Sequence, residues 1–454
     1  MIGIKGVGMT MLAQFLSEKG IEVVGSDTNE KFMTDEVLKK CKIKIFEKFD
    51  KNNIPKDADL IIYSTAYNEK NNPEVEALRA MPNKKNMIYA EALGEIFNQQ
   101  FGIAVVGSHG KTTTSAWLGF VMHKAGLNPS VMVGARVPQF DGASLVGKSD
   151  YLVAEIDEYQ NKLQYFQPKA VLLNNIDYDH PDFFPTPEDY ENVFIEFIKK
   201  IPKKGFLVAN IDDPIIRKTA QVNCRAKVIT YSINESADYV AYDIKQLNNQ
   251  QYFKVKLGVD EEGDVLGDFV ISLSGKHNVY NALAVIATCI ELNIELSQIR
   301  TYLEEFEGTA RRMQTLGEYN GATIIDDYAH HPAEIKTTLE GARQIYPDKK
   351  ITVVFHPHTF TRTKALINDF ASSFGDADKV IVIDIYGSAR EEQGGVHSKD
   401  LVREIKAKTP KLKVEYIPTL NEVEKYLRDN VKRDEIVILM GAGDIFRVGE
   451  NLVK

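Results

Sequence analysis

Short runs of aliphatic and β-branched residues recur along this chain of 454 residues, and amphipathic segments separate them. Such runs are typical of strands that are buried on both faces of a sheet, with helices connecting one parallel strand to the next. The runs are IEVVGSD, DLIIYST, GIAVVGS, DYLVAEID, AVLLNNID, ATIIDD, KITVVFHP, KVIVIDI and EIVILMGAGD. The sequence therefore predicts an α/β fold with parallel sheets.

Two joints divide this pattern into three domains, roughly the number that a chain of this length suggests. The first domain boundary lies near residues 93–101, where a helix-like segment precedes a new strand, and the second lies near residues 307–320. Alternating segments between KVITYSI and FVISLSG predict antiparallel hairpins late in the middle domain. We expect the domains at residues 1–96, 97–309 and 310–454.

The composition excludes several classes of function. Lys and Arg total 55 against 64 for Asp and Glu, a formal net charge of −9, and no long basic run offers a surface for nucleic acid. The three cysteines lie far apart without a CxxC pair, which argues against a disulfide framework or a thiolate metal site. No apolar stretch has the ~18 residues of a membrane span, and the first residues lack the form of a signal peptide. We expect a cytoplasmic protein with no nucleic-acid or membrane partner.

The stretch GIAVVGSHGKTTTSAW, residues 102–117, predicts a phosphate-binding loop between a strand and a helix. Such a turn directs backbone N–H groups and the helix dipole at a phosphate, while a lysine adds positive charge and a threonine hydroxyl can bind Mg²⁺. The usual spacing, G-x-x-x-x-G-K-[ST], would place glycine where this chain has Val105. We expect Trp117 to lie in the core. The residues of the predicted ATP and Mg²⁺ site are Gly107, Gly110, Lys111, Thr112 and Thr113.

Two of the predicted strands end in acidic and amide residues. Because the carboxyl ends of parallel strands share one edge with the phosphate loop, these groups can reach Mg²⁺ and the γ-phosphate. Capping of the next helix is the alternative for any single one of them. The residues are Glu155, Asp157 and Glu158 in YLVAEIDE, and Asn174, Asn175, Asp177, Asp179 and His180 in AVLLNNIDYDH.

The first residues, MIGIKGVGMTMLAQFLSEKGIEVVGSD, are typical of a dinucleotide-binding unit whose first strand stands at the very start. A dinucleotide-binding dehydrogenase typically has the motif G-x-G-x-x-G. Here Gly6 and Gly8 match its first two glycines, but Met11 stands where the third glycine would be. The glycines therefore suit the pyrophosphate of a UDP group better than NAD. A nicotinamide oxidoreductase stays an alternative, although it leaves the loop GSHGKTTT unexplained.

Several motifs in a fixed order resemble those of the Mur ligases, a family that uses ATP to join an amino acid to a carboxylate on a UDP-sugar. The short loop GSHGKTTT of that family accounts for Val105. The resemblance implies a Rossmann-like N-terminal domain, a central P-loop ATPase-like domain and a Rossmann-like C-terminal domain. The other motifs are GVGM with GSD, EIDEY, NNIDYDHPDFF, GKHNVYNALA, RRMQ, DDYAHHPAEI, FHPHTFTRT and MGAGDI.

Within the family, DDYAHHPAEI, FHPHTFTRT and GSARE resemble most the branch that joins L-alanine to the lactyl carboxylate of UDP-N-acetylmuramate, in peptidoglycan precursor synthesis. The branch that attaches a tripeptide to this sugar in murein recycling is the alternative, and a P-loop ATPase coupled to a partner is a more distant one. The resemblance implies ATP, two Mg²⁺ ions and an acyl phosphate. Because the amine would bind in a different domain, we expect the last domain to close over the acyl phosphate and exclude water. The chain is expected to be a monomer or a homodimer.

The resemblance also implies roles in the central domain. Lys111 would hold the β- and γ-phosphates, Thr112 and Glu155 would bind one Mg²⁺, and His180 would serve the second ion. Glu158 would contact the substrate. The nucleotide base and ribose are expected at the helix that begins in GKHNVYNALA, where amides spaced three residues apart lie on one face. Its residues are His277, Asn278 and Asn281.

In the last domain the resemblance directs Arg312 toward the phosphates and Asp326 or Asp327 toward the ribose. An arginine fork suits a carboxylate, so Arg362 is expected to bind that of L-alanine. Some relatives carry a second arginine where this chain has Thr359. The residues expected around the amino acid are Tyr328, His330 and Arg362.

The first domain supplies the UDP contacts that the resemblance implies: Gly6, Gly8, Met9, Asp27, Ser64, Thr65 and Ala66. Histidines at 330, 331, 356 and 358 could instead suggest zinc, but three or four convergent ligands would be needed and no cysteine spacing completes them. His109 is expected to be a loop residue whose backbone, rather than its ring, binds the phosphate.

Overall fold

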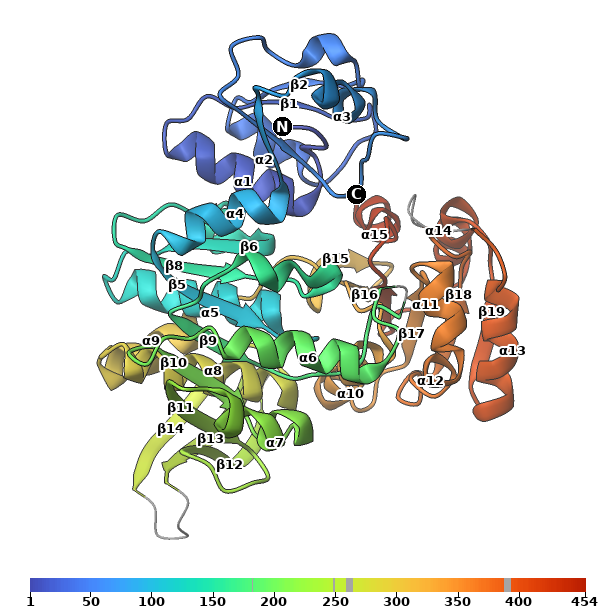
Figure 1. Cartoon of the computed structure of the whole chain (residues 1–454). Coiled ribbons are helices and arrows are strands. Elements are labelled where there is room, and N and C mark those ends of the chain that lie inside the picture. Colours follow the sequence, from blue (N-terminus) through green and yellow to red (C-terminus); the bar gives the residue numbers. More distant parts are fainter. Residues whose placement is uncertain (182, 248–249, 259–263, 388–392) are drawn as a thin grey trace.

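The computed structural model describes residues 1–181, 183–247, 250–258, 264–387 and 393–454. Three α/β domains follow one another along the chain (Figure 1). In this view the N-terminal domain, in blue, lies above the central domain, and the C-terminal domain, in orange and red, lies to the right of the central domain. Within these described ranges, no helix is both long enough and apolar enough to cross a membrane.

The N-terminal domain is built on short pairs of parallel strands. β1 pairs with β2 and β3 pairs with β4, and bridges from Ile2 to Ser26 and Tyr63 join the two pairs. The expected first strand is thus reduced to Ile2, because the chain turns at Gly3, whose φ is +78°. The elements are α1 (Val7–Glu18), β1 (Val24–Ser26), α2 (Asp35–Lys40), β2 (Lys44–Phe46), β3 (Leu60–Tyr63), α3 (Pro73–Ala77), β4 (Lys85–Ile88) and α4 (Tyr89–Asn98).

The central domain contains a ten-stranded sheet in the order β14-β13-β12-β11-β10-β9-β5-β8-β6-β7. β5 lies between β8 and β9 and runs parallel to both, so the ends of these three strands share one edge. β12, β13 and β14 pair antiparallel, which confirms the predicted hairpins. The strands are β5 (Phe101–Val106), β6 (Ser130–Val137), β7 (Gly142–Leu145), β8 (Tyr151–Glu155), β9 (Ala170–Leu173), β10 (Phe206–Asn210), β11 (Lys227–Ser232), β12 (Tyr239–Leu247), β13 (Gln250–Leu257) and β14 (Val265–Ile271). The helices are α5 (Lys111–Lys124), α6 (Pro187–Ile198), α7 (Pro214–Asn223), α8 (Lys276–Glu291) and α9 (Leu296–Glu305).

The C-terminal domain has a six-stranded sheet in the order β15-β16-β20-β17-β18-β19, in which β15 runs antiparallel to its neighbour and the other described pairs are parallel. Its strands are β15 (Gln314–Tyr319), β16 (Ala322–Asp327), β17 (Ile351–Phe355), β18 (Lys379–Val382), β19 (Lys413–Tyr416) and β20 (Ile436–Met440). Its helices are α10 (Pro332–Ile345), α11 (Phe360–Ala365), α12 (Ile367–Ala371), α13 (Ser398–Lys408), α14 (Leu420–Asn430) and α15 (Phe446–Val453).

Each run that the sequence analysis assigned to a strand forms one, and the predicted α/β class is confirmed. The domain limits at residues 96 and 309 stay predictions. Part of the motif GSARE, residues 388–391, lies outside the described residues, as does Asp182 in NNIDYDHPDFF.

The helix that follows the phosphate loop is buried along most of its length. Trp117 of α5 is fully buried, as expected, and its indole N–H donates to the Leu303 carbonyl oxygen at 3.2 Å. Its ring stacks on Phe306, with 5.3 Å between the centroids. Burial of this kind fixes α5, and therefore the loop at its N-terminus, against the central core.

We predict that Phe306→Ala lowers the free energy of unfolding of the central domain by about 3–5 kcal/mol, because it leaves a cavity against Trp117. The chain has one tryptophan, so its fluorescence during denaturant unfolding reports this core directly. Val222→Ala, at a position 83% exposed, is the matched control and should change stability by about 0.5 kcal/mol or less. Equal effects of the two substitutions would contradict the packing described here.

Candidate active site

The phosphate loop follows β5 and is attached to the end of β9. Gly107 and Gly110 adopt φ values of +130° and +79°. A Cβ at Gly107 would lie 2.8 Å from the Asn175 carbonyl oxygen, and one at Gly110 would lie 2.6 Å from Asn281 Oδ1, so only glycine fits at either position. The backbone N–H of His109 donates to Asn175 Oδ1 at 2.7 Å. The loop is therefore held in the turn that a phosphate requires, and α5 begins at Lys111.

Lys111 lies inside this loop and faces an acidic wall. Its ammonium donates to the carbonyl oxygens of Gly107 and Ser108 and, at 3.0 Å, to Glu158 Oε2. Burial alone would lower the pKa of Lys111, but the nearby carboxylates, Glu158 first, raise it above its ordinary value. Glu158 is itself buried and accepts from the Tyr190 hydroxyl at 2.9 Å. The lysine is thus kept cationic at the position predicted for the phosphates.

Thr112 and Glu155, the predicted ligands of one Mg²⁺, lie side by side. The Thr112 hydroxyl donates to Glu155 Oε1 at 2.8 Å, and the other carboxylate oxygen accepts from the Gly134 N–H at 2.6 Å. A hydroxyl and a carboxylate oxygen at this spacing match the hard oxygen ligands that Mg²⁺ prefers. Thr113, the next residue, lines the cavity described below.

His180 belongs to a second group of possible metal ligands. Asp157, Glu158 and His180 offer ligand atoms that all lie within 4.8 Å of one another. His180 adopts a φ of +58°, and its ring packs on Tyr159 with 4.5 Å between the centroids. The group borders Lys111 through Glu158, next to the phosphate loop. The four histidines considered for zinc lie outside it.

A cavity of about 570 Å³ opens beside the phosphate loop, between the central and C-terminal domains. The predicted nucleotide residues largely surround it. Asp327 lines the cavity, whereas Asp326 is buried behind it in an ion pair with Arg311 at 2.9 Å. Burial raises the pKa of Asp326 to about 6, although Arg311 opposes this. The expected residues that line the cavity are Gly110, Thr113, His277, Asn278, Asn281, Arg312 and Asp327.

The two asparagines of α8 lie on one face, as their spacing predicts. The Asn281 amide donates to Asn278 Oδ1 at 3.1 Å, and its own oxygen accepts from the Thr114 hydroxyl at 3.1 Å. Asn281 therefore also supports the helix that follows the phosphate loop. Burial, with Arg312 nearby, lowers the pKa of His277 to about 4, so its ring is neutral at pH 7.

Arg362 lies across the domain interface from the phosphate loop. Its guanidinium binds Asp179 through Nε at 3.2 Å and Nη2 at 3.3 Å, and both side chains are buried. Burial alone would raise the pKa of Asp179, but Arg362, followed by His180, holds it well below its usual range. The Thr359 hydroxyl accepts from the Arg362 backbone N–H at 3.3 Å. The role of Arg362 in binding L-alanine stays a prediction, because in this structure its guanidinium is paired with Asp179.

Tyr328 and His330 project from the loop between β16 and α10. Tyr328 lies under the guanidinium groups of Arg311 and Arg312, 5.0 and 5.5 Å from its ring centroid. His330 Nδ1 lies 3.0 Å from the Tyr328 carbonyl oxygen and 3.3 Å from Glu334 Oε2. Burial lowers the pKa of His330 to about 4, although Glu334 opposes this, so the ring is neutral at pH 7.

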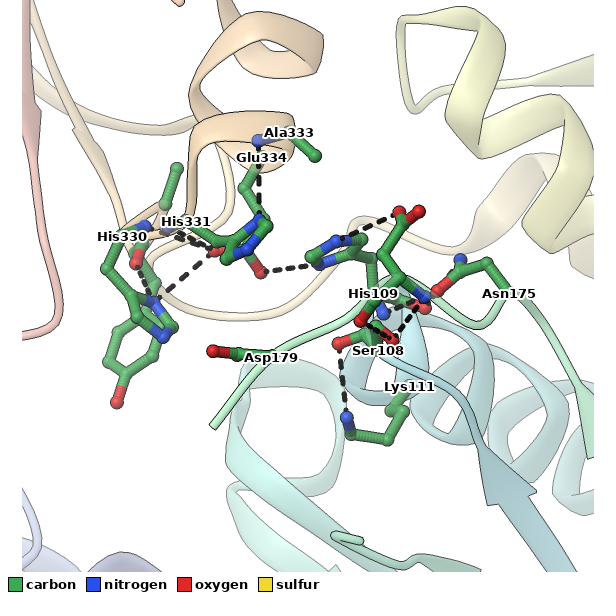
Figure 2. Close-up of polar contacts among 12 residues, drawn as sticks. Ser108, His109, Lys111, Asn175, Asp179, His330, His331, Ala333 and Glu334 are labelled. Carbon is green, nitrogen blue, oxygen red and sulfur yellow. Dashed lines mark hydrogen bonds and ion pairs between the residues drawn. The ribbon is translucent and has the colours of Figure 1, made fainter. Parts of the chain in front are cut away.

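His109 was expected to act through its backbone alone, but its ring lies between two carboxylates (Figure 2). Nε2 is 3.3 Å from Asp177, and Nδ1 is 3.5 Å from Glu334 of the C-terminal domain. Glu334 stands in the motif DDYAHHPAEI, yet sequence reasoning gave it no role. The motif includes Glu334, but its contact with His109 joins positions far apart along the chain, and the spacing of residues within a motif cannot predict such a contact.

The predicted UDP contacts gather in the N-terminal domain. Asp27, directly after β1, accepts from the backbone N–H groups of Lys5 and Thr28 at 2.7 and 2.8 Å, and burial raises its pKa. Lys5, which sequence reasoning missed, is buried and donates to the carbonyl oxygens of Thr28 and Glu30. It thereby fixes the segment after Asp27. The other residues are Gly6, which caps α1, Gly8 and Met9 in its first turn, and Ser64, Thr65 and Ala66 in the turn after β3.

Family models match the chain in three consecutive stretches. The model for the Mur ligase family, catalytic domain, matches residues 1–101, the Mur ligase middle domain matches residues 105–289, and the Mur ligase, glutamate ligase domain matches residues 311–443. Together with relatives that match over its full length, these show that the chain belongs to the Mur ligase family.

Two curated relatives illustrate the likeness. The UDP-N-acetylmuramate–L-alanine ligase of Desulfitobacterium hafniense is 38% identical over 453 residues, covering 100% of this chain and 98% of that protein. The ligase of the same name from Clostridium acetobutylicum is 36% identical, covering 99% of this chain and 96% of that protein.

Solved structures agree with these relatives. The UDP-N-acetylmuramate-alanine ligase of Thermotoga maritima matches with a TM-score of 0.83 and 26% identity, over 100% of this chain and 97% of that one. A murein peptide ligase from Psychrobacter arcticus shares the fold, with a TM-score of 0.75 and 24% identity, over 99% of this chain and 97% of that one.

We predict that the His109 ring titrates near pH 9. Burial would lower its pKa, but Asp177 and Glu334 raise it from 6.5 to about 9. A raised pKa in the folded state means that the stabilisation is complete below pH 6.5 and is lost as the pH rises through about 9. NMR of ¹⁵N-histidine-labelled protein measures the titration, and His109→Asn assigns the signal. A His109 signal that titrates below pH 6.5 would contradict the prediction.

Proposed function

We propose that this chain is an ATP-dependent ligase that joins L-alanine to the lactyl carboxylate of UDP-N-acetylmuramate in peptidoglycan precursor synthesis. One observation carries the proposal. The segments beside the phosphate loop contact the amino-acid side of the C-terminal domain through Asp179–Arg362 and His109–Glu334, and a cavity opens between the two domains beside the loop. A phosphoryl-transfer site thus adjoins a site that can hold an amino acid.

The first step is the transfer of a phosphoryl group to the sugar acid. A lactyl carboxylate oxygen attacks the γ-phosphorus, the bond to the β-phosphate oxygen breaks, and ADP and an acyl phosphate form. Lys111 and the backbone N–H groups of the loop would neutralise the phosphate oxygens, a role supported by the position of Lys111 within the loop at the start of α5. Thr112 and Glu155 would hold one Mg²⁺ and the group at His180 a second, and these ions would supply positive charge to the phosphates.

The second step forms the amide bond. The α-amine of L-alanine attacks the acyl carbon, the carbon–oxygen bond to phosphate breaks, and the nitrogen loses a proton, for which His330 Nε2 would be the acceptor. In the neutral His330 ring, Nδ1 faces a carbonyl oxygen, which can only accept, so Nδ1 carries the hydrogen and Nε2 keeps its lone pair. We assign His330 to the amine and Arg362 to the carboxylate of L-alanine. For Arg362 this requires that the substrate share the guanidinium with Asp179.

The two nucleotides would bind at opposite ends of the site. The adenine and ribose of ATP would lie in the cavity lined by α8, near Asn278, Asn281 and Asp327. The UDP group would lie at the N-terminus of α1 and beside Asp27. We place the reaction in the cytoplasm, with the chain acting as a monomer or a homodimer.

Phosphate release from ATP tests the proposal. We predict release that requires UDP-N-acetylmuramate, L-alanine and Mg²⁺ together, and that falls at least 100-fold in Lys111→Ala because the loop loses its cation. Glycine, L-serine and the tripeptide replace L-alanine in parallel reactions. Release with the tripeptide alone would move the chain to the recycling branch, and release without the sugar would overturn the ligase proposal.

A further inference from the structure

Glu334 is the carboxylate that connects the loop between β16 and α10, which carries His330, to the phosphate loop (Figure 2). It lies in the first turn of α10, three residues after its capping residue, His331. Its Oε2 accepts from the backbone N–H groups of His330 at 3.0 Å and His331 at 3.3 Å. Its Oε1 lies 3.5 Å from His109 Nδ1 and 3.7 Å from Arg312 Nη1. Oε2 therefore contacts only its own domain here, whereas Oε1 also reaches the phosphate loop of the central domain.

His109 approaches from the other side. Its backbone N–H is fixed by Asn175, and its ring packs on that of His331 with 5.1 Å between the centroids. Both ring nitrogens are buried, and among the described residues neither makes an aligned hydrogen bond. The contacts with Asp177 and Glu334 are therefore ion pairs, and they fix the place of the ring between the two carboxylates. The ring lines the nucleotide cavity beside Gly110.

The charges at this contact depend on one another. Glu334 has 11% of its side chain exposed, and burial alone would raise its pKa, yet His330, His109 and Arg312 hold it well below its usual range. A buried carboxylate is tolerated only when it is paired, and removing one partner leaves an uncompensated charge. Glu334 therefore loses one of its cationic partners when the C-terminal domain moves away from His109.

We propose that Glu334 and His109 are positioning residues that couple the amino-acid site to the phosphate loop. One oxygen of Glu334 fixes the backbone at His330, and the other pairs with His109, so His330 is held at a set place relative to the γ-phosphate only while the pair is formed. The inference rests on the proposed function for the identity of the amino acid. Neither residue touches the reacting carboxyl or amine in this assignment.

Two substitutions test the pair from its two sides. Glu334→Gln keeps a carbonyl oxygen for the backbone N–H groups of His330 and His331 but removes the charge that faces His109. His109→Asn removes the ring and keeps a polar side chain. Because the two variants alter different domains, a folding defect in one leaves the other as a test, and the melting temperature of each is measured. Glu340→Gln is the matched control, since it removes a 49% exposed carboxylate from the same helix.

We expect each variant to lower kcat/KM for L-alanine by about 10-fold or more while the Kd of ATP changes by less than about 3-fold, because the loop keeps its lysine and glycines. The double variant should be no worse than the poorer single variant, since both remove the same contact. Rates come from phosphate release, and the Kd comes from equilibrium binding of ATP without the sugar.

The inference is overturned if the losses in the two variants multiply in the double variant, or if Glu340→Gln causes the same loss. It is also overturned if both variants leave the kinetics for L-alanine unchanged. These outcomes leave the proposed function intact as long as the unaltered protein requires L-alanine. Phosphate release by the unaltered protein that ignores L-alanine would overturn both.

Discussion

The buried ion pair between Asp179 and Arg362 is the contact on which the arrangement of the site depends. The two residues stand 183 positions apart, on the central and C-terminal domains, and both are shielded from water. Charges buried in this way must be paired, so each side chain needs the other domain in place. Together with the pair His109–Glu334, this pair makes the interface between the central and C-terminal domains depend on balanced charge as well as on packing.

The central sheet supplies the other half of this arrangement. β5, β8 and β9 run parallel and end at one edge, so the phosphate loop, Glu155 and the segment that carries Asp179 are brought together by topology. The glycines of the loop then admit the close approach of Asn175 and Asn281. Residues distant in sequence thereby form one phosphate site on a rigid edge, and the C-terminal domain adds the amino-acid side.

Much of this could be predicted from the sequence, because it depends on local patterns. Buried apolar runs predicted most of the inner strands of the two large sheets, but not β6 and β10, which were not among those runs. The loop GSHGKTTT predicted the turn between β5 and α5. The short strands β2 and β4 were not predicted, because they have few residues and mix polar with apolar ones. The choice between Asp326 and Asp327 also needed the structure, because strand alternation sends one toward Arg311 and the other toward the cavity. The pairs Asp179–Arg362 and His109–Glu334 join different domains, and no spacing rule reaches across such distances.

Small-angle X-ray scattering on Asp179→Asn tests most directly whether buried charge holds the C-terminal domain in place. The substitution keeps the shape of the side chain but leaves Arg362 buried without its counter-charge, at a cost of about 3–5 kcal/mol. The unaltered chain should give the scattering curve calculated from the arrangement in Figure 1, and Asp179→Asn should give a larger radius of gyration. A curve for Asp179→Asn that superimposes on that of the unaltered chain would contradict this account.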